Sequence, residues 1–345
     1  MKNEMKVREW LLHAKSCYEE AYSLYLSPRK TRFGMQVVYN CCMASEMILK
    51  AVSCGLGIPA DNSHAIMLLF FDIDRKMKGL SPDWTSKDIL GPSGRLFGLS
   101  GKYRYPDAYD SPESWKRIAT DSTVRKTLRD MEEITDYAGS VFKKAFGIDI
   151  SRHFMKHDIR ETAPIDDSAV LTSAMIDGTS EDLSCWLTYS RSFSDAANNR
   201  IRQFNKTGKL TTESKRFLCH YCQQATELML KGVLRFHGID SSGHNLSGLI
   251  RDIENINGLP PVPKELKNGC TVLQRYDGDG KYPVSTLSVP TPRPSDTDVE
   301  RCIDGMAAAY GFGKNVFAGY SIDIGSELGA FTPLRPKQKH DLNRL

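Results

Sequence analysis

The sequence predicts an all-α protein built from two tandem four-helix up-and-down bundles. Three observations lead to this fold class. Apolar residues recur at three- and four-residue steps over long segments, the pattern of a helix with one buried face. No segment shows a convincing strand-like alternation of apolar and polar residues. The same set of short residue patterns also occurs twice, in the same order, along the 345 residues. We therefore expect two similar helical bundles packed as a pseudo-dimer.

The repeat is defined by landmarks whose spacing changes only across loop-like stretches, as insertions into a tandem duplication would produce. The matched landmarks, first copy before second, are Trp10 with Trp186, Glu46 with Glu227, Lys50 with Lys231, Gly57-Ile58 with Gly238-Ile239, His64 with His244, and Arg104-Tyr105 with Arg275-Tyr276. We expect a first bundle over residues 5–147, a linker over 148–180, a second bundle over 181–320 and a C-terminal tail over 321–345.

Each bundle is expected to contain four long helices. In the first copy the apolar spacing predicts helices over residues 7–26, 32–54, from Asn62 or Ser63 through Ile73, and 122–146. The second of these should stop at Gly55 and Gly57, because glycine suits a left-handed C-cap. The second copy predicts helices over residues 182–204, 213–237, 244–257 and 296–318.

A long irregular stretch precedes the last helix of each copy. It runs from Leu80 to Ser111 in the first copy and from Asn257 to Ser295 in the second. Each has room for a short helix, over 93–99 and 264–273. Loops of this length in compact domains are usually functional or mobile, so we look for sites there.

Composition limits the possible classes of function. The net charge is +4, from 46 basic and 42 acidic residues, so any nucleic-acid surface must be a local patch. Nine scattered cysteines, an odd number, fit a reducing compartment better than a secreted disulfide framework. The apolar run that begins at Trp10 is too short and too charged for a signal peptide or a membrane span. We expect a cytoplasmic protein with no membrane partner.

The sequence contains two pairs, each of one acidic and one basic residue, with the spacing of a helical ion pair. Glu46 and Lys50, and likewise Glu227 and Lys231, are four residues apart. A surface pair of this kind is worth roughly 0.3 to 0.5 kcal/mol, which alone would explain the residues. Both pairs lie in the most apolar stretch of their helices, which instead favours partners in an interface or a binding pocket.

Histidines and arginine-tyrosine pairs are the other candidate ligand-binding residues. His64 and His244 fall where the third helix of each copy begins, where a histidine can bind a ligand, titrate, cap or pack. Arg104-Tyr105 and Arg275-Tyr276 offer a guanidinium for phosphate and a ring for base stacking. The alternative is an arginine that fastens its loop to a carboxylate of the bundle.

These residues together resemble the HEPN family. The resemblance depends on Ala-Ser-Glu46-x3-Lys50-Ala in the second helix, on a histidine opening the third, and on Arg-Tyr-Pro in the long loop. It covers residues 5–146 and again 182–319. It implies small helical bundles that associate as dimers, with roles in nucleotide or RNA binding and in toxin and antiviral systems. The second copy departs from the pattern, because Asp277 follows Arg275-Tyr276.

Ribonucleases of this family carry an arginine, four to six residues, and then a histidine. Three segments match, but only Arg152-His153-Phe-Met-Lys-His157 also has histidine directly after the arginine. His157 could move the proton of a ribose 2′-hydroxyl while Arg152 stabilises the phosphorane charge, and no metal would be needed. The pair lies in the expected linker, however, and the second copy has no counterpart.

The leading hypothesis is a tandem HEPN-like module that binds a nucleotide or RNA, of a toxin-antitoxin or antiviral defence system. One alternative is a metal-independent endoribonuclease that uses Arg152 and His157. Another is a structural module that docks a separate catalytic subunit, such as a nucleotidyltransferase or another effector. We expect no cofactor and no metal, since the zinc-like spacing of Cys219 and Cys222 lies in a helix without a second ligand pair.

Overall fold

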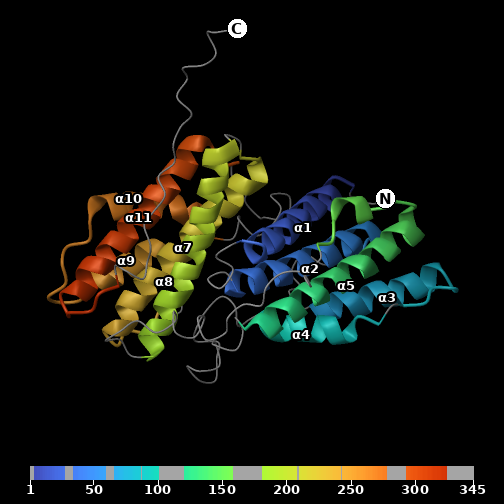
Figure 1. Ribbon diagram of the computed structural model, residues 1–345, viewed down its shortest axis with the longest axis horizontal. Coiled ribbons are helices and arrows are strands. Elements are labelled where there is room, and N and C mark those ends of the chain that lie inside the picture. The colour runs from blue at the N-terminus through green and yellow to red at the C-terminus, as the bar shows by residue number, and fades with distance from the viewer. Residues whose placement is uncertain are drawn as a thin grey trace, which may run out of the picture. The chain divides into compact units, whose positions relative to one another are not determined.

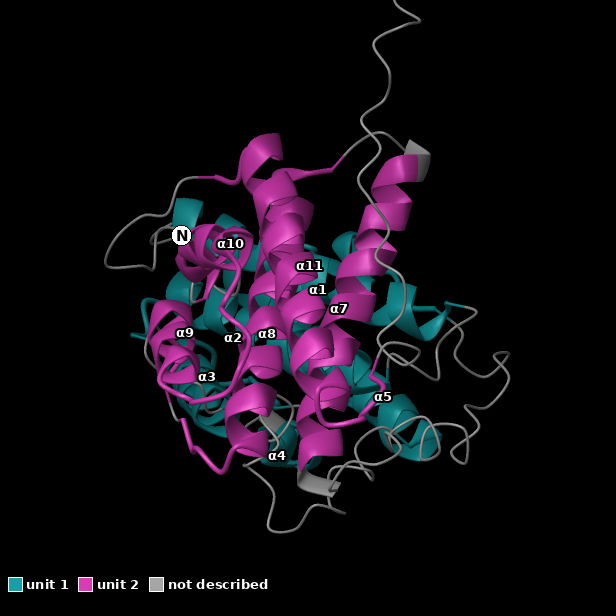
Figure 2. Cartoon of the chain, turned by 90° about the vertical axis from the view of Figure 1, so that its left-hand side faces the viewer, with its two compact units in different colours: residues 1–174, 281–291 teal, residues 175–280, 292–345 magenta. Residues whose placement is uncertain are grey.

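The computed structural model describes residues 4–27, 34–59, 66–86, 88–100, 120–157, 181–207, 210–241, 243–277 and 293–324. Within these ranges every regular element is a helix (Figure 1). The prediction of an all-α fold is therefore confirmed. The chain divides into two compact units, whose described parts lie in residues 4–157 and 181–324 (Figure 2).

Unit 1 is organised around its second helix. Its elements are α1 (Glu4–Tyr25), α2 (Gly34–Leu56), α3 (Ile66–Leu80), α4 (Leu90–Ser100), α5 (Asp121–Phe146) and the 3-10 turn η4 (Ser151–His153). Helix α2 packs against α1, α3, α4 and α5. All of its residues are buried, including the charged Glu46 and Lys50. Helix α2 therefore carries buried charged groups, which need hydrogen-bond or ion-pair partners.

Unit 2 has the same order of helices. Its elements are α7 (Glu181–Thr207), α8 (Thr212–Phe236), α9 (Leu246–Glu254), α10 (Lys264–Leu273), the 3-10 turn η5 (Gln274–Tyr276) and α11 (Asp296–Ala318). Helix α8 packs against α7, α9, α10 and α11. Its buried residues include Gln223, Glu227 and Lys231. The central helix of each unit thus carries a buried acidic and basic pair.

Glycine ends the central helix of each unit in the same way. Gly57 and Gly238 both have φ of +73°, in the left-handed region that glycine adopts without strain. The next residue closes the helix in each case: the N–H of Ile58 donates to the carbonyl of Ser53 at 2.8 Å, and that of Ile239 donates to Leu234 at 3.0 Å. The expectation of a glycine stop is confirmed at Gly57, while Gly55 remains inside the helix.

The two long irregular stretches contain the short helices α4 and α10, which pack against α5 and α11 respectively. In unit 2 this contact is very close, because Gly269 and Gly305 face each other where α10 crosses α11. A Cβ atom built on Gly305 would lie 2.9 Å from the Cα of Gly269. Each unit is therefore a bundle with a fifth, short helix. The expected start of the third helix at Asn62 or Ser63 lies outside the described residues.

Among the described helices, α2 is long and apolar enough to cross a membrane by length and composition. It is buried throughout. This is weak support for a membrane span, because the core helix of a soluble protein passes the same test.

Candidate functional site

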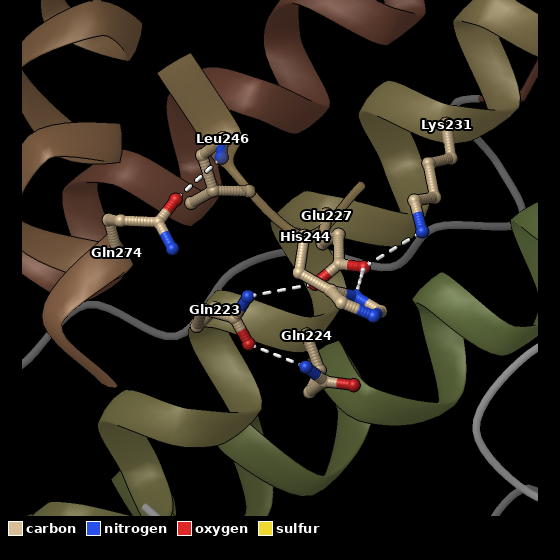
Figure 3. Close-up of polar contacts among 7 residues, drawn as sticks. All are labelled: Gln223, Gln224, Glu227, Lys231, His244, Leu246 and Gln274. Carbon is tan, nitrogen blue, oxygen red and sulfur yellow. Dashed lines mark hydrogen bonds and ion pairs between the residues drawn. The ribbon is translucent and has the colours of Figure 1, made fainter. Parts of the chain in front are cut away.

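A buried carboxylate organises the polar centre of unit 2 (Figure 3). Glu227 on α8 has no exposed side-chain surface. Its Oε1 lies 3.1 Å from Nζ of Lys231 and 2.8 Å from Nδ1 of His244. Its Oε2 accepts a hydrogen bond from Nε2 of Gln223 at 2.9 Å. Both oxygens are thus occupied by donors, which a buried carboxylate requires.

Neighbouring groups stabilise the ionised form of this carboxylate. Burial alone would raise the pKa of Glu227, but the hydrogen bond to His244 and the positive charge of Lys231 outweigh burial. The pKa of Glu227 is therefore lowered. Lys231 also lies over the ring of Trp186 on α7, with Nζ 6.0 Å from the ring centre. The lysine of the pair thus lies near an aromatic ring, and the glutamate contacts His244.

His244 reaches Glu227 because α9 begins after it. The expected helix over 244–257 is shorter in the structure, where Asn245 caps α9 by accepting from the N–H groups of Ser247 and Gly248. His244 therefore lies before the helix, where its ring can turn toward α8. Its side chain is 48% exposed. The histidine thus joins a fully buried carboxylate to the surface.

The turn after α10 contacts the N-terminal end of α9, the end that His244 precedes. The side chain of Gln274 accepts a hydrogen bond from the N–H of Leu246, the first residue of α9, at 2.6 Å (Figure 3). Arg275 follows Gln274 directly and is exposed. The Gln274 contact therefore joins the turn that carries Arg275 to the start of α9.

Arg275 and Tyr276 have opposite environments. The pKa of Asp298 on α11 is lowered mainly by the hydrogen bond from Ser295, and the positive charge of Arg275 lowers it further. Tyr276 is buried at 3% exposure, packed near Cys219 and Cys302. The expectation that Tyr276 offers its ring for base stacking is not met in this structure, because the tight 3-10 turn directs this ring into the core.

Unit 1 contains a similar buried pair. Nζ of Lys50 lies 2.9 Å from Oε1 of Glu46 and 5.1 Å from the ring centre of Trp10 on α1. Both charged side chains are at most 5% exposed. The same combination of glutamate, lysine and tryptophan thus occurs on corresponding helices of the two units. His64, Arg104 and Tyr105, the other expected site residues of this copy, lie outside the described residues.

Arg152 and His157 contact different partners. The ring of His157 packs on Tyr22 with centroids 4.7 Å apart. Arg152 is exposed. The hydrogen bond from Ser151 lowers the pKa of Asp149, and the positive charge of Arg152 adds to this effect. A cavity of about 890 Å³ lies between α5 and this segment, lined by Asp136, Asp149 and Lys156 among others, but neither Arg152 nor His157 lines it. No contact among the described residues joins the two side chains.

Three residues of the unit 2 site were not expected from the sequence. The sequence marks Trp186 only as a landmark of the repeat, although its place one helix before a Glu-x3-Lys pair is a usable signal. Gln223 lies four residues before Glu227, the spacing of neighbours on a helix face. Gln274 gives no local signal, since its partner Leu246 is 28 residues away.

A metal centre finds no support in the part of the chain that the structure describes. No group of three or more histidine, cysteine, aspartate or glutamate side chains is placed there to hold a metal ion. The nine cysteines, all within the described ranges, are buried and form no disulfide.

Comparison with known proteins gives one match. No curated protein and no solved structure matches the chain. Residues 202–316 match a family model, and this segment includes α8, α9 and α10 with Glu227, Lys231, His244 and Arg275. The model is that of the HEPN domain.

Proposed function

We propose that unit 2 is a module that binds a nucleotide, either free or as part of RNA, beside His244 and Arg275. The observation that carries the proposal is the His244–Glu227 contact of 2.8 Å, which fixes a half-exposed imidazole on a fully buried carboxylate. Because the histidine is already held in place, less side-chain conformational entropy is lost when a ligand binds. A HEPN domain supports a nucleotide- or RNA-related module in general.

Arg275 supplies the phosphate contact in this proposal. Its guanidinium is exposed and planar, and it can donate two parallel hydrogen bonds to phosphate oxygens. The neighbouring Asp298 accepts from the hydroxyl and N–H of Ser295 through Oδ2, at 2.7 and 3.0 Å. Nearby Arg301 also contributes positive charge at Asp298. The two arginines supply positive charge that an anionic ligand needs.

We further propose that unit 1 is another copy of the module, with its own ligand-binding residues at Arg104-Tyr105. The pair of Glu46 and Lys50 beneath Trp10 supports this proposal, because it repeats the arrangement of unit 2. The HEPN match itself covers only residues 202–316. In this proposal the two copies form a pseudo-dimer that acts in defence, alone or with an effector such as a nucleotidyltransferase.

Titration of nucleotides and short RNA against the full chain tests the binding proposal. Arg275→Ala should weaken binding by about 1.5 to 3 kcal/mol, the worth of a hydrogen bond to a charged group. Arg275→Lys should restore only part of the loss, because lysine lacks the planar fork. The control is Arg251→Ala, which removes an exposed arginine from α9 of the same unit. Absence of binding, or an equal loss in the Arg251 and Arg275 variants, would contradict the proposal.

A further inference from the structure

A cleft of about 890 Å³ lies in unit 1 between α5 and the segment that follows it. Sites for small molecules usually measure roughly 300 to 1,000 Å³. One wall includes a stripe of α5 from Asp136 through Gly139 to Lys143, residues three and four positions apart on one face of the helix. The other wall is formed by residues 149–156. We call this site the α5 cleft.

The second wall of the α5 cleft is held in place by its own contacts. Ile150 and Phe154 are buried, and the ring of Phe154 packs edge-on against Tyr18 of α1 with centroids 5.4 Å apart. Nζ of Lys156 lies 2.7 Å from Oδ2 of Asp136, which ties the end of this wall to α5. The cleft is therefore formed before a ligand binds, so less conformational entropy is lost on binding.

The end of the cleft at Lys156 is acidic. The ammonium group of Lys156 already pairs with Asp136. That hydrogen bond raises the pKa of Lys156, and the negative charges of Glu132 and Glu133 raise it further. Three carboxylates thus act on one ammonium group, so this end disfavours an anionic group of a ligand.

The opposite end of the cleft offers a cation without an ion-pair partner. Lys143 lines the cleft and is exposed, and its side chain has no hydrogen bond or ion pair with any residue that the structure describes. Oδ1 of Asp149 accepts from the N–H and the hydroxyl of Ser151, at 2.9 and 2.6 Å. These bonds lower the pKa of Asp149, and the positive charges of Arg152 and Lys143 lower it further. Two cations thus act on one carboxylate, so this end favours one negative charge on a ligand.

An exposed methionine gives the cleft an apolar part. Met155 lines the cleft and is 72% exposed, although Ile150 and Phe154 in the same wall are buried. On the α5 wall Gly139 has no side chain, and a Cβ atom built there would meet only Ile150, at 3.8 Å. A ligand that covers Met155 would remove apolar surface from water, and the flexible thioether adapts to the shape of what it covers.

We propose that the α5 cleft binds a small molecule that has one carboxylate and an apolar body, with the carboxylate at Lys143 and the body against Met155. A carboxylate fits better than a phosphate, because Asp149 would repel the second negative charge of a phosphate. The seven residues from Asp136 to Lys143 rise by about 10 Å, which sets the length of such a ligand. This site is separate from the nucleotide site proposed for unit 2 and does not depend on it.

Three ligands with one apolar body and different head groups test the proposal. The compounds 4-phenylbutyrate, 4-phenylbutanol and 4-phenylbutylammonium are titrated against the full chain by calorimetry at about pH 7, where the carboxylate and the ammonium are both charged. We expect the carboxylate to bind about tenfold more tightly than the alcohol, the lower end of the range for a hydrogen bond between charged groups. The ammonium compound should bind most weakly, because Lys143 repels it.

Three variants assign the contacts. Lys143→Met should abolish the preference for the carboxylate over the alcohol. Met155→Ala should weaken both compounds by about threefold and keep the preference, because it removes only apolar surface. Lys126→Met is the matched control, since this exposed lysine lies on α5 outside the cleft, and it should change neither affinity. All three side chains are exposed, so the fold should stay intact.

Several outcomes would overturn the proposal. They are no binding of the carboxylate by the wild-type chain, equal binding of the carboxylate and the ammonium compound, and a carboxylate preference that survives in Lys143→Met. An equal loss of the preference in Lys126→Met would likewise overturn it, because the effect would then come from net charge alone. None of these results bears on nucleotide binding by unit 2, so the two proposals fail separately.

Discussion

Lys231 and Glu227 form an ion pair across one turn of α8, with 3.1 Å between their atoms and no more than 5% of either side chain exposed. Removing one member of such a pair leaves a charge buried with too few partners. We expect Lys231→Met to lower the free energy of unfolding of unit 2 by about 3 kcal/mol, measured by urea denaturation.

A half-exposed ion pair in the same unit provides the control. Lys267 on α10 pairs with Glu254 at the end of α9, and both side chains are 40% exposed or more. Lys267→Met should cost about 1 kcal/mol or less, because surface pairs gain little. Equal losses in the two variants would show that the Glu227 carboxylate does not depend on Lys231.

The capping box of α11 should make stability depend on pH. The hydroxyl of Ser295 donates to Asp298, and this bond, with the charge of Arg275, lowers the pKa of Asp298. A carboxyl with a lowered native pKa stabilises the fold fully above the ordinary aspartate value of about 3.9, and the contribution is lost as pH falls through the lower native value. The difference in unfolding free energy between wild type and Asp298→Asn should therefore be present at neutral pH and disappear in acid. A difference that persists unchanged in acid would contradict this.

Local patterns in the sequence predict much of the fold and part of the site. The glycine stops at Gly57 and Gly238 and the buried pairs on α2 and α8 were predictable, because each depends on residues within one or two helical turns. The contact of His244 with Glu227 was not predictable in detail, since it requires the Asn245 cap that ends the loop before α9. Both residues were nevertheless singled out by their place in the repeat.

Tyr276 shows where reasoning from residue type fails. An aromatic residue beside an arginine suggests a nucleic-acid surface, but exposure depends on the rotation of the backbone. The 3-10 turn that follows α10 places Arg275 in solvent and Tyr276 in the core. Neighbouring residues in such a turn point in different directions, and only the tertiary packing of α8 and α11 decides which of them is buried.

The crossing of α10 and α11 should not tolerate a side chain. The Cβ atom of Gly305→Ala would lie 2.9 Å from the Cα and 3.2 Å from the carbonyl carbon of Gly269, so backbone would have to move. We expect a loss of about 1 to 3 kcal/mol in the unfolding free energy. Gly311→Ala on the same helix is the control, since its Cβ meets nothing within 4 Å. It should stabilise by up to about 1 kcal/mol through helix propensity, and a similar loss in both variants would contradict the close-packing explanation.

Arg152 and His157 provide the last prediction, which separates a binding module from a nuclease. Metal-independent cleavage of RNA needs a general base and a cation that converge on one phosphate, each within hydrogen-bonding reach. In unit 1 the ring of His157 packs on Tyr22, whereas Arg152 lies exposed by Asp149. We therefore expect no EDTA-resistant cleavage of labelled RNA and no products with 2′,3′-cyclic phosphate ends. His157→Ala and Arg152→Ala are the matched controls, because both residues are exposed and their loss should leave the fold intact. Cleavage by the wild-type chain that both variants abolish would show that ligand binding brings the two side chains together, and the enzyme hypothesis would then replace the binding module.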